Sequence, residues 1–104
     1  MTTTIEIRDD FSLTFKLPTS DDMRGAFRLK TRLSDAMSGT DEDAQLAVFA
    51  EVQAVLGRLL VGSSDQTETL EGIRDSALFF GATGVTLWME LHFRNYREAH
   101  RAAQ

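Results

Sequence analysis

Apolar and polar residues alternate over residues 4–17 with the period of a β-strand. The apolar positions of this segment are Ile5, Ile7, Phe11, Leu13, Phe15 and Leu17. Pro18 follows directly and cannot continue a strand ladder. We therefore predict a β-hairpin over about residues 4–17. An isolated hairpin is only marginally stable, so its apolar face must lie on helices or its strands must pair with another chain.

The loop of this hairpin decides which side chains share a face. A three-residue loop that ends at Asp10 pairs Ile7 with Phe11 and Ile5 with Leu13, which keeps one face apolar. A two-residue turn would instead put the two apolar sets on opposite faces of the hairpin. We predict the three-residue loop, with Asp10 near the left-handed region that Asp tolerates better than most residues.

The hydrophobic period changes to that of an α-helix after the hairpin. Thr19 followed by Asp22 resembles a capping box with Asp in place of Glu. Gly39 stands at the other end of the pattern, where a helix is expected to stop. These signals predict a first helix over about residues 20–38, in which Gly25 costs about 1 kcal/mol relative to alanine.

Thr40 and Asp43 repeat the capping pattern, and Gly62 closes a second helix predicted over about residues 41–61. Its large apolar side chains cover about half of the helix circumference, which is more than a surface helix requires. They are Leu46, Val48, Phe49, Val52, Val55, Leu56, Leu59 and Leu60. We infer that this helix is either central to the fold or shared with a partner.

The last third of the chain holds an uncharged run, Ala77–Met89, of 13 residues. It is too short to cross a bilayer, which requires about 20 apolar residues. A short helical segment is expected at residues 70–74, and a strand is conceivable for GVTLWMEL. The distribution of polar residues favours one helix over about residues 75–103, or two half-helices that break at Gly81–Gly84.

Composition and charge restrict the class of protein. With 104 residues the chain has the size of one domain, 1–104, and it contains no cysteine, which excludes disulfides and thiolate chemistry. The net charge is −5 and is concentrated in residues 33–75, which argues against nucleic acid as a partner. The N-terminal residues lack the features of a secretory signal, so we expect a cytoplasmic protein without a membrane partner.

No motif in the sequence indicates catalysis, a metal ion or a cofactor. His92 and His100 are two helical turns apart and have no third ligand nearby. The GATG segment lacks the glycine spacing and the lysine of a phosphate-binding loop. The acidic residues 41–43 are expected to be charges of a helix start rather than calcium ligands. We therefore expect a non-enzymatic protein.

Two sets of residues are candidates for contacts with other chains. The apolar interface set consists of Phe49, Val52, Leu56, Leu59, Leu60, Phe79, Phe80, Trp88, Leu91 and Phe93. The set for charge pairing between copies consists of Arg24, Arg28, Arg32, Asp41, Glu42 and Asp43. Core packing explains part of the first pattern, and a solvated face is the simplest interpretation of the second. Self-association and a helical client explain the remainder.

The hairpin IEIRDDFSLTFKLP, the PTSDD helix start and the helical body that follows resemble the tail assembly chaperones of long-tailed phages. The resemblance covers the order of elements over most of the chain and contains no sharp motif. The elements predicted above give an α+β, mostly helical fold with an N-terminal β-hairpin and three to four helices. The resemblance implies oligomers that hold the long helical tape-measure protein in solution, in the host cytoplasm.

The sequence therefore predicts a non-enzymatic, self-associating chaperone for an apolar helical client. An acidic inhibitor or adaptor that blocks a basic host factor is an alternative, and a structural subunit of a virion is another. The chaperone is expected to form oligomers alone and to bind its client with little dependence on salt, whereas the inhibitor would lose affinity steeply as salt is added.

Overall fold

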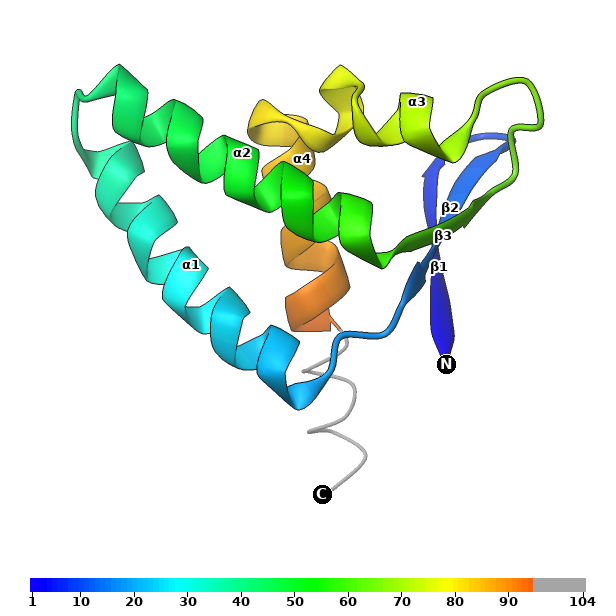
Figure 1. Ribbon diagram of the computed structural model, residues 1–104, viewed down its shortest axis with the longest axis horizontal. Coiled ribbons are helices and arrows are strands. Elements are labelled where there is room, and N and C mark those ends of the chain that lie inside the picture. The colour runs from blue at the N-terminus through cyan, green and yellow to red at the C-terminus, as the bar shows by residue number, and fades with distance from the viewer. Residues whose placement is uncertain (95–104) are drawn as a thin grey trace.

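The computed structural model describes residues 1–94, which form a small α+β fold with an N-terminal antiparallel hairpin followed by helices (Figure 1). In Figure 1 the sheet stands at one end, and the helices extend from it. The elements are β1 (Thr2–Arg8), β2 (Phe11–Lys16), α1 (Ser20–Ser38), α2 (Glu42–Leu59), β3 (Leu60–Ser63), α3 (Leu70–Arg74), the 3₁₀ turn η1 (Ala77–Phe79), α4 (Gly81–Met89) and the π-helical turn η2 (Glu90–Arg94). The predicted fold class is confirmed.

The hairpin has the predicted register in its body and a different one at its tip. Ile5 pairs with Leu13 as predicted, and Asp10 is left-handed with φ 64°. The predicted pair of Ile7 with Phe11 is wrong, because Arg8 pairs with Phe11. Ile7 is the extra residue of a β-bulge, which lets a tight turn close the hairpin without rotating its apolar face outward.

The sheet has a third strand, which the sequence pattern did not reveal. The sheet order is β1-β2-β3, and β3 is antiparallel to β2. The predicted helix over residues 41–61 therefore ends earlier, at Leu59, and Leu60 turns into the strand and pairs with Phe15. Leu60 and Phe15 are both buried, so the paired strand residues belong to the core.

Side chains cap both long helices. The capping box of α1 has Thr19 as the N-cap, and Asp22 accepts a hydrogen bond from the Thr19 backbone N–H at 2.8 Å. The N-cap of α2 is Asp41, one residue later than predicted, and its carboxylate accepts a hydrogen bond from the Ala44 N–H at 3.2 Å. Each cap satisfies a donor that a helix start otherwise leaves unpaired.

The predicted continuous helix over residues 75–103 is wrong for the residues that the structure describes. The chain forms α3, as predicted, and then η1, α4 and η2 in place of one helix. Gly81 has φ 70°, a left-handed conformation that starts α4 in a new direction. The break thus falls at the first glycine of the pair considered from the sequence. Residues 95–103 of this prediction lie outside the described residues.

One hydrophobic core joins the sheet to the helices. The largest side chains that are completely buried are Trp88, Phe15 and Phe79, and Phe15 and Phe79 lie with ring centroids 6.1 Å apart. Helix α2 contacts α1, α3, α4 and η1, so it has neighbours on several sides. None of the helices within residues 1–94 is long and apolar enough to cross a membrane.

Candidate protein-binding surfaces

Most of the predicted apolar interface lies in the core of a single chain. Seven of its ten residues are no more than 3% exposed, namely Val52, Leu56, Leu59, Leu60, Phe79, Trp88 and Leu91. Side chains of this kind cannot contact another protein unless the chain unfolds. This corrects their assignment to an interface: the broad apolar arcs of the helices are covered by other elements of the same chain.

The other three residues of that set, Phe49, Phe80 and Phe93, are half-buried. Phe93 packs edge-on against Trp88 and against Phe27, with ring centroids 5.7 Å and 5.5 Å apart. Phe49 and Phe80 form another edge-on pair, with ring centroids 5.6 Å apart. The Phe27–Phe93 and Phe49–Phe80 pairs each join a long helix to the last third of the chain, so they support the fold and also keep part of each ring at the surface.

The Phe49–Phe80 pair continues into an exposed apolar residue. Leu46 is 47% exposed and lies one helical turn before Phe49 on α2. We call Leu46, Phe49 and Phe80 the α2 patch. Other exposed apolar side chains, Phe27, Met37 and Val61, lie on α1 and β3.

Within the predicted charge set, two arginines form ion pairs inside the chain. Arg24 binds Asp21 at 2.8 Å, and Arg32 binds Glu51 of α2, with a hydrogen bond of 2.9 Å. Both pairs are exposed, so each contributes little to stability. Asp41 caps α2, whereas Arg28, Glu42 and Asp43 are exposed. Pairing between copies stays a prediction for these last three residues.

A third ion pair joins the start of α1 to the end of α2. Arg58 binds Asp22 at 2.9 Å, and the Asp22 side chain is only 9% exposed. Burial would raise the pKa of the Asp22 carboxyl, but hydrogen bonds from the Thr19 backbone and hydroxyl together with the Arg58 guanidinium outweigh it, so the pKa lies below its usual value. This contact orients α1 against α2.

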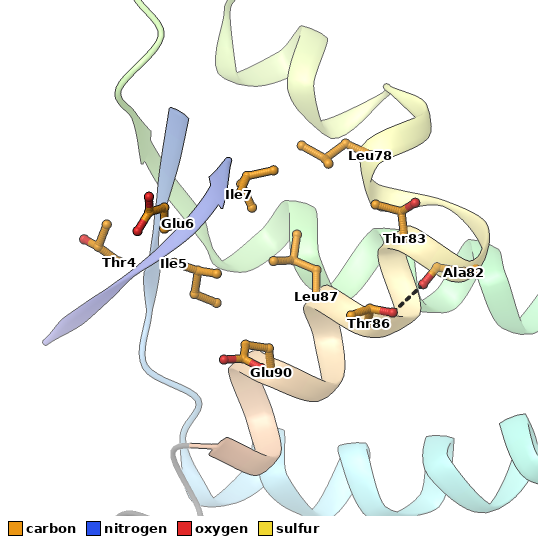
Figure 2. A pocket seen from close by; sticks show the side chains of 10 residues that line it. All are labelled: Thr4, Ile5, Glu6, Ile7, Leu78, Ala82, Thr83, Thr86, Leu87 and Glu90. Atoms are coloured by element: carbon orange, nitrogen blue, oxygen red, sulfur yellow. Dashed lines mark hydrogen bonds between the residues drawn. The ribbon is translucent and has the colours of Figure 1, made fainter. Parts of the chain in front are cut away.

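An open groove of about 730 Å³ lies between β1 and α4 (Figure 2). One wall is formed by residues 4–7 of β1, with Ile5 and Ile7 directed toward the helix side. The other wall consists of Leu78, Ala82, Thr83, Thr86, Leu87 and Glu90. The Thr86 hydroxyl donates to the Ala82 carbonyl at 2.9 Å and is therefore already engaged. We call this feature the β1–α4 groove.

The groove runs along the outer edge of β1, which pairs with no strand on that side among residues 1–94. Side chains of consecutive strand residues point to opposite faces, so four consecutive residues of β1 can line one groove only where it follows the strand's edge. The sequence analysis did not identify this surface. The available signal was a predicted hairpin without a neighbour for its first strand, which leaves one edge unpaired in any arrangement.

A buried histidine lies in η2, directly after α4. His92 is completely buried, and its Nδ1 is 3.1 Å from the Trp88 carbonyl oxygen. Its Nε2 has no hydrogen-bond partner among residues 1–94. Burial lowers the pKa of the imidazole, because desolvation disfavours its charged form. His92 is therefore neutral in the folded chain near neutral pH.

Among residues 1–94, no group of three or more His, Cys, Asp or Glu side chains is arranged to hold a metal ion. Comparisons of the chain with protein-family models, with curated proteins and with solved structures found no significant match. The candidate surfaces therefore depend on their own geometry, and they are a strand edge and a small apolar patch. Both are surfaces suited to another polypeptide.

Proposed function

We propose that this chain is a non-enzymatic, self-associating chaperone that holds an apolar helical segment of a client protein. The observation that carries the proposal is the α2 patch, where Leu46, Phe49 and Phe80 leave apolar surface in contact with water. An amphipathic helix that lays its apolar face on such a patch buries both surfaces.

The client site is smaller than the sequence pattern suggested, because the core takes up most of the predicted interface. A small patch favours weak and reversible binding, which suits a chaperone that releases its client during assembly. The net charge of −5 favours solubility of the complex through repulsion between copies. We expect the protein to act in the cytoplasm.

The particular form that we propose is a tail assembly chaperone of a long-tailed phage, whose client is the tape-measure protein. The support is the order of elements, a β-hairpin followed by helices, which agrees with the resemblance described for the sequence. Co-expression with the tape-measure protein of a long-tailed phage tests this form. The soluble fraction of the tape-measure protein should rise, and an unchanged fraction would contradict this identification.

Client binding itself is tested by fluorescence anisotropy with a labelled amphipathic helical peptide that has a leucine face and no net charge. Leu46→Gln should weaken binding by roughly tenfold, because it removes the burial of one leucine. Met37→Gln is the matched control, since Met37 is 45% exposed on α1 and lies outside the patch.

The expected affinity changes little between low and high salt, because apolar burial is not screened. Equal losses in the Leu46 and Met37 variants would exclude the patch as the client site. Binding that requires a basic peptide and disappears with salt would replace the chaperone with an acidic inhibitor.

A further inference from the structure

We propose that two copies of the chain associate through the free edges of their β1 strands, which pair antiparallel and join the two sheets into one. This inference deepens the self-association of the proposed function. It concerns the β1–α4 groove and not the α2 patch, so client binding and dimerisation are separable by experiment.

The pairing of β1 with β2 fixes the direction of the backbone groups in β1. In an antiparallel pair, hydrogen-bonded and non-hydrogen-bonded residue pairs alternate. The Leu17 N–H donates to the Met1 carbonyl at 3.1 Å, so this pair is hydrogen-bonded, and by alternation the pair of Ile5 with Leu13 is hydrogen-bonded as well. Thr4 and Glu6 then direct their N–H and C=O groups away from β2, toward the groove that they line.

The opposite side of β2 supports this alternation independently. Ser12 pairs with Glu6 across the hairpin, and its backbone bonds to Ser64, the residue after β3. The Ser12 carbonyl accepts from the Ser64 N–H at 3.0 Å. The Ser12 N–H donates to the Ser64 hydroxyl at 2.8 Å. Because Ser12 turns its backbone toward Ser64, it cannot bond Glu6, and the Glu6 backbone faces the free edge.

The outer edge of β1 carries little of the usual protection against pairing. Protected edges carry charged side chains (lysine above all), proline or a bulge, or are covered by another element. Residues 2–6 contain neither lysine nor proline and have Glu6 as their single charged residue, and the bulge at Ile7 lies beyond them. The β1–α4 groove leaves room beside the strand (Figure 2).

Residue chemistry selects the register. Hydrogen-bonded pairs can join only residues that face the edge in both copies. Pairing Glu6 with Glu6 sets like charges directly opposite one another, which is destabilising. Pairing Thr4 with Thr4 puts Ile5 opposite Thr3 and gives up apolar contact. Pairing Thr4 with Glu6 places the Thr4 hydroxyl beside the Glu6 carboxylate and sets Ile5 of one copy opposite Ile5 of the other. In each Thr4–Glu6 pair the two residues exchange both backbone N–H···O bonds.

This register is self-complementary and has a two-fold axis beside Ile5. The core faces of both sheets then point the same way, so α4 of each copy lies on one side of a continuous sheet. Ile5 of the second copy enters the groove near Ile5 and Leu87 of the first. The contact closes on itself and stops at two copies through this edge.

The test changes the charge at position 4, whose side chain is exposed on the outer face of the sheet. In the proposed register residue 4 faces Glu6 of the other copy twice. Thr4→Lys should therefore tighten the dimer and Thr4→Glu should loosen it, each by roughly two- to thirtyfold in Kd. Both variants lose the same hydrogen bond between the Thr4 and Thr14 hydroxyls, so they are matched to each other.

Net charge alone would shift association in the same direction, so Thr31→Lys and Thr31→Glu on α1 serve as controls. Thr31 is exposed and lies on another element. Molecular mass is measured by light scattering or sedimentation over a wide concentration range, with circular dichroism to verify the fold. Opposite effects at position 4 that exceed those at position 31 support the proposal.

A backbone variant provides a second measurement. Thr4→Pro removes an N–H that the hairpin does not use, so it should leave the fold intact and abolish dimerisation. A wild-type chain that stays monomeric at every concentration would overturn the inference and leave client binding on the α2 patch to be judged separately. Dimers that persist in Thr4→Pro, or a weakening by both lysine and glutamate at position 4, would exclude this edge or this register.

Discussion

We expect Gly84→Ala to destabilise the protein, although the same change in an exposed helix usually stabilises it. Gly84 is a buried residue of α4. A methyl group at this position would overlap the backbone carbonyl group of Phe79, and the Phe79 Cα would be 3.3 Å away. Gly25 of α1 is the matched control, because a methyl group there would meet no atom of residues 1–94 within 4 Å.

The expected loss in the free energy of unfolding follows from the displacement that the added methyl group imposes on Phe79. Phe79 is completely buried and packs against Phe15, so its backbone cannot shift without disturbing the core. Overpacking of a core destabilises a protein by up to about 3 kcal/mol, and we expect the upper end of this range here. The better helix propensity of alanine offsets about 1 kcal/mol of this loss. We therefore expect Gly84→Ala to lower the free energy of unfolding by about 2 kcal/mol, and Gly25→Ala to raise it by about 0.4–1 kcal/mol.

Urea unfolding followed by circular dichroism measures both variants against the wild type. In thermal unfolding, the Tm should fall by about 8–16 °C for Gly84→Ala and rise by a few degrees for Gly25→Ala. If Gly84→Ala were as stable as Gly25→Ala, the tight packing of α4 against η1 would be wrong, and with it the break of the chain at this point.

Three further predictions concern polar side chains. Burial lowers the pKa of His92, so the unfolded chain takes up a proton near pH 6.5 that the folded chain does not. The free energy of unfolding should therefore decrease as the pH is lowered below 6.5, by up to about 1.4 kcal/mol per pH unit. Urea titrations at several pH values should show a shallower slope in His92→Gln, and an unchanged slope would contradict this role. The pKa of Asp22 is lowered, so the stability that its carboxylate contributes is present above the usual pKa of 3.8 and is lost as the pH falls further. Asp22→Asn should therefore lower the free energy of unfolding by about 1 kcal/mol at neutral pH and flatten the dependence of stability on pH in acid. An unaltered dependence in acid would refute the role of Asp22. Arg74 donates hydrogen bonds to the carbonyls of Gly57 at 2.7 Å and Leu60 at 3.1 Å. Arg74→Met should therefore lower the free energy of unfolding, measured in urea, by about 2 kcal/mol. A loss close to zero would contradict this prediction and show that water replaces both bonds.

Local signals in the sequence were sufficient for the first half of the fold. The alternation of residues 4–17, the capping box at Thr19 and Asp22, and the tolerance of Asp10 for the left-handed region each act over a few residues, and each is present in the structure. The bulge at Ile7 was missed because its cause is the competition between a tight turn and the shared apolar face.

The second half required information that local patterns do not hold. Leu60 continues the helical pattern of α2, yet it starts a strand because the far edge of β2 is available for pairing. The run around Phe79 reads as one helix until Gly81 adopts a positive φ. At Leu60 a contact between distant segments overrides local preference, which is all that a sequence pattern shows. At Gly81 the glycine permits either a continued helix or a break, so the pattern alone does not decide between them.

The same reasoning explains why the predicted interface became the core. The apolar arc of α2 is wide because several elements pack on this helix, and the short pieces after residue 70 can cover it from more directions than one long helix could. The requirement for a partner therefore does not follow from the width of the arc. The apolar side chains have neighbours within one chain, whereas the outer backbone groups of β1 pair with no strand among residues 1–94. The case for association thus depends on the strand edge rather than on the helices.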